Sequence, residues 1–237
     1  MTAPLRLDRR LVELTGCPRA QAQRWIEGGW VTVDGVVVEQ PQRMVTTEEV
    51  VLNTEERVDQ TPPATMLLHK PDGVAPADLP QLISDETHSL LDASGVRTLQ
   101  RHFHGQRFLA APLAGDESGL VVITQDPRVQ RFMQQRLADL EQEYLVEVRG
   151  DILPYGLQRL ASGLQFGGRP IPRCRVSWQN EERLRFAIKP VLPGQLQHMC
   201  AEVGLEVVQV RRLRIGRVAL GRIAPGQWRY LGPEERF

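Results

Sequence analysis

The sequence predicts an α+β protein of two domains, the second built on a mostly antiparallel mixed sheet flanked by helices. The chain has 237 residues, more than the ~100–200 residues usual for one domain. A polar stretch at 54–64 contains a double proline, which is typical of a linker. Beyond it, several strand-like segments accompany only a few helical ones. We therefore expect a small domain over residues 1–60 and a larger one over 61–237.

The first domain begins with two predicted helices, at 7–14 and 18–27, each followed by a glycine. Apolar side chains of the first recur every three or four positions and therefore share one face. Asp34 and Gly35 lie between two runs of β-branched residues, which is the strongest short-range signal for a β-hairpin. A further strand is predicted at 50–52.

The second domain is predicted to combine short strands with two helices. Helical spacing of apolar side chains predicts helices at 127–140 and from 194 to about 203. Apolar runs and alternating polar and apolar residues predict strands at 66–68, 119–124, 144–148, 183–188, 205–211 and 213–220. In the segment 75–110 we expect Leu82, Ile83, Leu90 and Leu91 to lie in the core.

Charge is balanced overall but divided unevenly along the chain. The 29 basic and 29 acidic residues give zero net charge, which argues against a basic coat for nucleic acid over the whole surface. Residues 1–62 hold seven Arg and ten acids, a net of −3, so residues 63–237 carry +3. Residues 205–237 alone hold seven Arg and three Glu, a net of +4. Local contact with RNA phosphates therefore remains compatible with the composition.

Composition also indicates a compartment and excludes several classes of protein. No run reaches the ~18 apolar residues of a membrane helix, and the N-terminus lacks the apolar core of a signal peptide. The three cysteines are far apart, which favours a reducing compartment over disulfides or a zinc site. His88, His102 and His104 have no Cys or carboxylate at ligand spacing. We expect a cytoplasmic monomer without a metal, and no interaction with membranes.

A predicted helix–turn–helix at 7–27, followed by Gly-Trp-Val-Thr-Val-Asp-Gly-Val-Val-Val at 29–38, resembles the S-four (alpha-L) RNA-binding domain, hereafter the S4 domain. The resemblance implies that basic residues of the two helices hold structured RNA, usually ribosomal. Arginine on a fixed helical surface suits phosphate contact. The matching residues are Arg6, Arg9, Arg10, Arg19 and Arg24.

Three stretches of the second domain resemble the ribosomal-RNA pseudouridine synthases that carry an S4 domain at their N-terminus. They are Leu-His-Lys-Pro-Asp-Gly-Val at 68–74, the segment 111–126, and the C-terminal signature at 194–231. The resemblance implies a target nucleotide flipped out of its stack and an isomerisation that needs no cofactor. It further implies an Asp acting as nucleophile or base, an Arg paired with it, and a Tyr against the base. Lys70 of the first motif and Tyr144 are the corresponding candidates for RNA contact.

The sequence departs from this family at its reactive positions. Ala114 stands where the catalytic Asp is expected, and Pro112 replaces the Arg of the same motif. Gln197 replaces the Arg that would pair with the Asp, and Gln142 replaces a Lys two residues before Tyr144. An alanine methyl can neither attack nor accept a proton. Loss of both charges avoids leaving one of them buried and unpaired.

Three hypotheses for the function follow. The leading one is a catalytically inactive RNA-binding protein that recognises structured, ribosomal RNA. The first alternative is an active pseudouridine synthase using Asp116, although that residue lies up to about 7 Å further along the chain, and a displacement of about 1 Å already costs ~100-fold in rate. The second alternative is a protein-interaction scaffold that does not bind RNA.

Overall fold

The computed structural model describes residues 4–53, 63–104, 107–162, 164–189 and 191–237. It forms two compact units, Met1–Pro63 with Arg97–Gln106, and Ala64–Val96 with Arg107–Phe237. Residues 97–106 thus join the N-terminal unit, although a linear boundary at 60/61 assigns them to the second domain. The Glu39 carboxylate accepts hydrogen bonds from Arg97 Nη2 (3.3 Å) and from the backbone N–H of Gln100 (2.9 Å). The predicted linker falls mostly outside the described residues.

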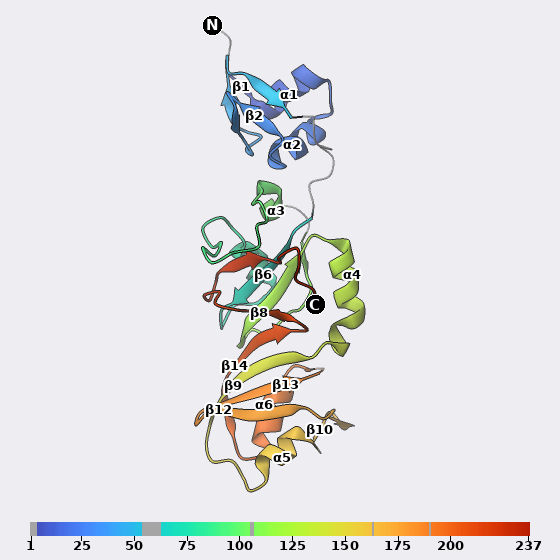
Figure 1. Ribbon diagram of the computed structural model, residues 1–237, viewed down its shortest axis with the longest axis vertical. Helices are drawn as coiled ribbons and strands as arrows, with labels where there is room; N and C mark the ends of the chain where they lie inside the picture. The colour runs from blue at the N-terminus through green and yellow to red at the C-terminus, as the bar shows by residue number, and fades with distance from the viewer. Residues whose placement is uncertain (1–3, 54–62, 105–106, 163, 190) are drawn as a thin grey trace. The chain divides into compact units, whose positions relative to one another are not determined.

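The N-terminal unit contains both predicted helices and the predicted hairpin (Figure 1). Its elements are β1 (Leu5–Arg6), α1 (Leu7–Thr15), α2 (Arg19–Glu27), β2 (Val31–Val33), β3 (Val36–Val37), β4 (Met44–Val45), β5 (Val50–Leu52) and α3 (Gln100–His104). Asp34 and Gly35 have φ of 51° and 77°, as a two-residue hairpin turn requires. The Asp34 carboxylate also accepts the N–H of Glu49 at 2.9 Å, which ties the turn to the approach of β5.

The second unit is built, within the described residues, on a nine-stranded sheet of order β12-β13-β9-β14-β8-β6-β16, with β15 beside β14 and β7 beside β8. Its strands are β6 (Thr65–Lys70), β7 (Phe108–Leu109), β8 (Glu117–Thr124), β9 (Gln142–Arg149), β12 (Arg175–Asn180), β13 (Arg183–Ile188), β14 (Glu206–Ile215), β15 (Val218–Ala219) and β16 (Trp228–Tyr230). Among these described pairs, β14 and β8 run parallel and the others antiparallel. The α+β class with a mostly antiparallel mixed sheet is therefore confirmed.

Helices cover the two ends of this sheet differently. The remaining elements are η1 (Pro76–Leu82), α4 (Pro127–Arg136), η2 (Leu137–Asp139), α5 (Gly156–Ala161), α6 (Gln195–Ala201) and a short hairpin of β10 (Gln165–Phe166) and β11 (Arg169–Pro170). Helix α4 lies beside β8, whereas α5 and α6 pack near β12 and β14 (Figure 1). Met133 of α4 joins Leu67, Leu120, Val122 and Ile215 in a buried cluster. The β12 end of the sheet is thus packed by α5 and α6 and not by α4 (Figure 1).

Two expectations for this unit were wrong. The predicted break between the segments 205–211 and 213–220 is absent, because β14 (Glu206–Ile215) continues through a bulge between Arg212 and Arg214. The end of the second segment turns back and forms the separate strand β15 (Val218–Ala219). Leu90 and Leu91 are not core residues, since their exposed fractions are 100% and 66%. They lie in a turn closed by the hydrogen bond from Asp92 N to Ser89 O. Ile83 is buried as predicted.

No helix among the described residues has both the length and the apolar character needed to cross a membrane.

Candidate functional site

The arginines at the start of the N-terminal unit are organised around one buried carboxylate. Asp8 of α1 is fully buried and accepts hydrogen bonds from Arg6, Arg19 and Gln23 at 2.9–3.1 Å. Burial acts to raise the pKa of Asp8, but these hydrogen bonds together lower it to about 2. The carboxylate therefore stays ionised and fixes two guanidinium groups, that of Arg6 from β1 and that of Arg19 from α2.

The other three candidate arginines lie on the same two helices. Arg9 and Arg24 are exposed, and within the described residues neither side chain forms an ion pair. Arg10 pairs at 3.5 Å with Glu13, one helical turn away on the surface. The structure thus brings Arg6 and Arg19 together through Asp8 and leaves Arg9 and Arg24 unpaired. Exposed, unpaired guanidinium groups are suited to bind phosphate.

The loop that carries Ala114 is closed by an acid that the sequence reasoning did not single out. The N–H of Ala114 donates to Glu117 Oε2 at 3.1 Å, and the N–H of Glu117 donates to Ala114 O at 3.2 Å. Glu117 is buried at the start of β8. The only signal for Glu117 in the sequence was that it occupies a motif position at which Thr is usual in the resembling family. Asp116, by contrast, is exposed on the turn.

The side chain of Lys70 holds this loop by donating hydrogen bonds to main-chain carbonyl oxygens of the loop. It is fully buried, and its Nζ donates to the carbonyl oxygens of Pro71, Gly115 and Glu117 at 3.0, 2.9 and 2.6 Å. Burial lowers the pKa of Lys70, although neighbouring acids, including Asp72 and Glu117, oppose this. Its donors are directed at the loop and not at solvent. We therefore assign Lys70 to the loop and no longer to RNA contact.

Arg212 anchors the other side of the loop and was also missed as a candidate. Its guanidinium donates to Leu120 O (2.8 Å), Ala111 O (2.5 Å) and Gln142 Oε1 (3.2 Å). Tyr144, its register partner on β9, donates through its hydroxyl to the same Gln142 oxygen at 2.7 Å. Tyr144 is almost fully buried, which raises the pKa of its phenol. These residues form a satisfied polar network beneath the loop.

The reactive groups of the motif are absent from this framework. Position 114 carries a methyl group, and both buried cations beside the loop, Lys70 and Arg212, are bound mainly to main-chain oxygens. Gln197 lies in α6, and its side-chain oxygen is buried with no hydrogen-bond partner in the described part of the chain. The loop is thus held in place by buried cations, but it carries no Asp at position 114.

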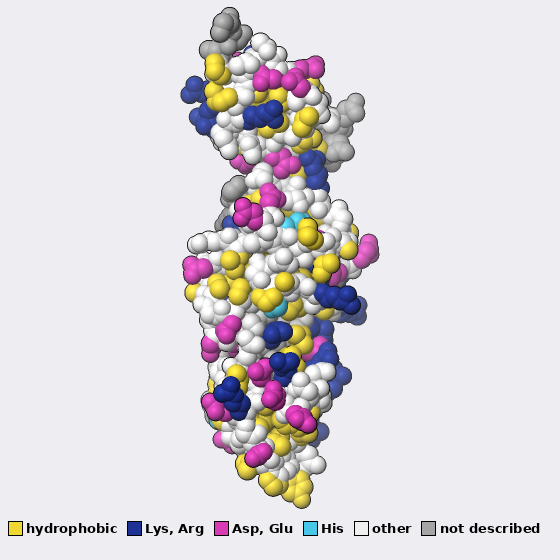
Figure 2. Space-filling model, turned by 90° about the vertical axis from the view of Figure 1, so that its left-hand side faces the viewer, with side chains coloured by type: hydrophobic (Ala, Val, Ile, Leu, Met, Phe, Trp, Pro, Cys, Tyr) yellow, Lys and Arg dark blue, Asp and Glu magenta, His cyan; other side chains and the backbone are white. Residues whose placement is uncertain are grey.

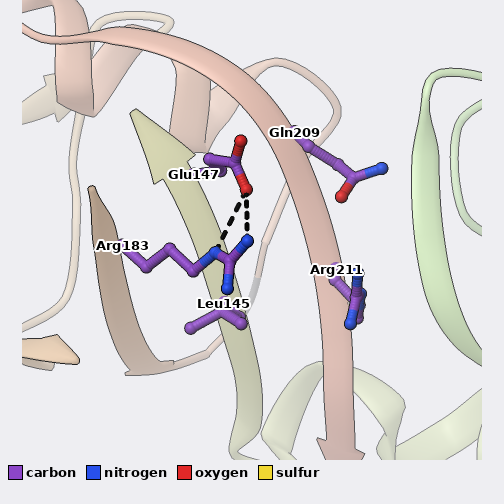
Figure 3. Close-up of a pocket in the computed structure, with 5 residues that line it drawn as sticks. All are labelled: Leu145, Glu147, Arg183, Gln209 and Arg211. Carbon is purple, nitrogen blue, oxygen red and sulfur yellow. Dashed lines mark hydrogen bonds and ion pairs between the residues drawn. The ribbon is translucent and has the colours of Figure 1, made fainter. Parts of the chain in front are cut away.

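A small recess lies on the sheet face opposite Tyr144. It has a volume of about 10 Å³, room for one water molecule. Figure 3 shows its lining residues, Leu145, Glu147, Arg183, Gln209 and Arg211, with the Arg183–Glu147 ion pair at its side. Over the visible surface in Figure 2, basic and acidic side chains are interspersed, in keeping with the zero net charge.

Within the described residues, no group of three or more His, Cys, Asp or Glu side chains could hold a metal ion. His88 instead bonds Asp92 at 2.7 Å and stacks on Trp228 with ring centroids 4.3 Å apart. The side chain of His104 lies outside the described residues.

Comparisons with known proteins agree with this architecture. A model of the S4 domain matches residues 5–51. Ribosomal small subunit pseudouridine synthase A of Escherichia coli K12 is 28% identical over 236 residues, covering 98% of each chain. Dual-specificity RNA pseudouridine synthase RluF of the same organism is 26% identical, covering 98% of this chain and 77% of its own.

A crystal structure of a pseudouridylate synthase superposes with a TM-score of 0.57 at 22% identity, covering 96% of both chains. Fold and site therefore define an S4 domain followed by a pseudouridine-synthase fold. Over nearly its whole length the chain is similar to these two RNA pseudouridine synthases.

Proposed function

We propose that this protein binds structured ribosomal RNA and does not carry out the aspartate-dependent isomerisation of uridine. The observation that carries the proposal is the loop at 111–117, which is held by Lys70 and Arg212 yet has a methyl group at Ala114. A methyl group offers no lone pair for attack and no site for a proton. The framework of the site is retained without its reactive group.

RNA contact is proposed for the S4 surface, where Arg6, Arg9, Arg10, Arg19 and Arg24 would contact phosphates. Contact of Tyr144 with a flipped base is no longer proposed, because this side chain is almost fully buried and its hydroxyl donates to Gln142. Support comes from the match to the S4 domain, from a relative named as a ribosomal small subunit pseudouridine synthase, and from one named as a dual-specificity RNA pseudouridine synthase. We further propose sequence domains over 1–60 and 61–237, with residues 97–106 of the second packed into the N-terminal unit, and a cytoplasmic monomer that uses neither metal nor cofactor.

The proposal is tested by binding and turnover measurements on the same protein. Purified small-subunit ribosomal RNA is titrated in gel shifts with the wild type and with Arg9→Gln/Arg24→Gln. We expect roughly tenfold weaker binding of the double variant, since each lost phosphate contact removes a counterion-release contribution. Carbodiimide primer extension on the same RNA should show no new pseudouridine. Absence of wild-type RNA binding would favour the scaffold hypothesis.

A second candidate, an active synthase with an unusual acid, is favoured by the Glu117 carboxylate 3.1 Å from the backbone N of Ala114. In such a reaction the C1′–N1 bond breaks, a C1′–C5 bond forms, the proton leaves C5 and N1 gains one. The carboxylate is regenerated. Robust turnover that Glu117→Gln abolishes would establish this candidate and refute the inactive assignment. Loss with Asp116→Asn alone would point instead to the exposed acid of the turn.

A further inference from the structure

The sheet face opposite Tyr144 and Arg212 is lined by arginines that lie over glutamates. Strand register places Arg183, Glu147 and Gln209 in one row and Arg185, Leu145 and Arg211 in the next. Because side chains alternate across a strand, the intervening residues point to the buried face. We call this open surface the arginine face, and its charged residues are Arg175, Arg183, Arg185, Arg211, Arg214, Glu141, Glu143 and Glu147.

Arg183 and Arg185 are the outer layer of the arginine face. Their side chains are 44% and 45% exposed, against 31% and 16% for their partners Glu147 and Glu143. Arg214 lies deeper, at 24% against 35% for Glu141. Five arginines and three glutamates give the face a net charge of +2. Each carboxylate fixes its arginine, as Glu147 does by accepting from both Nε and Nη2 of Arg183 at 3.1 and 2.9 Å. The remaining N–H groups of Arg183 and Arg185 stay available to an external acceptor.

Arg211 is the cation of this face that lacks a counter-ion. Within the described residues its guanidinium forms no ion pair, and its Nε is buried without an acceptor. It lies on β14 beside Leu145, next to the Arg183–Glu147 pair (Figure 3). An unpaired guanidinium next to an oriented one can hold an anion between them.

We propose that the arginine face binds the phosphates of an RNA strand, as a second contact surface besides the S4 helices; this rests on the proposed function. Arg183 and Arg185 are two residues apart on one strand, about 7 Å, a spacing similar to that of successive phosphates in a nucleotide chain. Contact through phosphates needs no base sequence. The face therefore adds affinity and position along the RNA and takes no part in recognition of the base.

The test compares two triple variants that remove equal charge from the second unit. Arg183→Gln/Arg185→Gln/Arg211→Gln alters the face, and Arg128→Gln/Arg131→Gln/Arg136→Gln alters α4. Dissociation constants for small-subunit ribosomal RNA and for fluorescein-labelled oligouridine are measured by anisotropy over a KCl series. We expect the face variant to bind roughly tenfold more weakly at low salt, with a log–log salt slope shallower by about 2. The α4 variant should change much less.

Equal effects of the two triple variants would overturn the proposal, because only net charge would then matter. RNA binding by the face variant that equals that of the wild type would overturn it too. Polyglutamate serves as a second probe: if the face variant lost binding to polyglutamate while its RNA binding was unaltered, the face would bind an acidic protein and the proposal would fail. Arg211→Gln alone leaves no glutamate without its ion-pair partner. It therefore serves as the control that separates loss of RNA contact from misfolding of the triple variant. Arg9→Gln/Arg24→Gln in the same series separates the claims: if only that variant weakens binding, the face proposal fails and the RNA-binding function stands.

Discussion

The backbone N–H of Ala114 donates a 3.1 Å hydrogen bond to the buried carboxylate of Glu117. Glu117 lies three positions after Ala114, which stands where the motif has its acid. The carboxylate closes the turn on itself, while Lys70 and Arg212 hold the turn from outside through carbonyl oxygens. A loop that has lost its reactive side chain can therefore keep its shape.

Glu117→Ala should destabilise the protein by about 1–2 kcal/mol, because it leaves the N–H of Ala114 without its acceptor in a partly buried loop. Urea unfolding should show a lower midpoint at unchanged slope. Asp116→Ala is the matched control, since that acid is exposed on the same turn, and it should stay within about 0.5 kcal/mol. Equal costs for both acids would contradict a bracing role for Glu117.

Ala114→Asp alone should not create an active synthase. The new carboxylate would lie close to Glu117, and like charges at short range destabilise the ionised pair. The Arg that pairs with the Asp in the resembling family is Gln197 here. We expect no pseudouridine by primer extension and a loss of stability that diminishes as the pH is lowered toward 4. Turnover by the single variant would show that the remaining framework is sufficient.

Local patterns predicted the regular elements of this protein well. The α1 and α2 helices, the Asp34-Gly35 hairpin and β13 follow from periodicity and turn chemistry that operate over a few residues. Strands β12 and β16 were missed, and Leu90 and Leu91 were placed in the core although they are exposed. Pairing across more than a hundred residues decides the position of β16, as in the register of Trp228 with Leu68. Strand β12 pairs with its sequence neighbour β13.

The candidate site was predictable only in part for the same reason. Motif spacing located Ala114 and Tyr144, but no local pattern indicates that Lys70 is buried against the carbonyls of 115 and 117 or that Arg212 bonds Gln142. These contacts depend on strands brought together by the sheet. A lysine or arginine in a motif could equally have faced RNA.

Lys70→Met should cost about 2–4 kcal/mol, because three carbonyl oxygens around the loop lose a charged donor while remaining buried. Chemical denaturation of the variant provides the measurement. Lys189→Met is the matched control: Lys189 is the other lysine of the chain and is exposed, so its removal should be nearly neutral. If the Lys70 variant were as stable as the Lys189 variant, the loop would not depend on this ammonium group.

Asp8 should contribute stability that depends on pH in a defined window. Its pKa is about 2 in the folded protein, against 3.8 for the ordinary carboxyl, because hydrogen bonds from Arg6, Gln23 and Arg19 outweigh the cost of burial. A depressed folded-state pKa means that the contribution is fully present above pH 3.8 and is lost as the pH falls through about 2. Allowing for solvent screening of the half-exposed arginines, it is on the order of 1–2 kcal/mol.

The measurement for Asp8 is the free energy of unfolding against pH for the wild type and for Asp8→Asn. The difference between the two proteins should be constant from pH 7 to about 5 and should shrink between 3.8 and 2. Subtraction removes the acid titration that both proteins share. Glu13→Gln changes an exposed acid of the same helix, so its difference from the wild type should be small throughout. A difference for Asp8→Asn that persisted unchanged at pH 2 would show that its effect is steric and does not come from the ionised carboxylate holding Arg6 and Arg19.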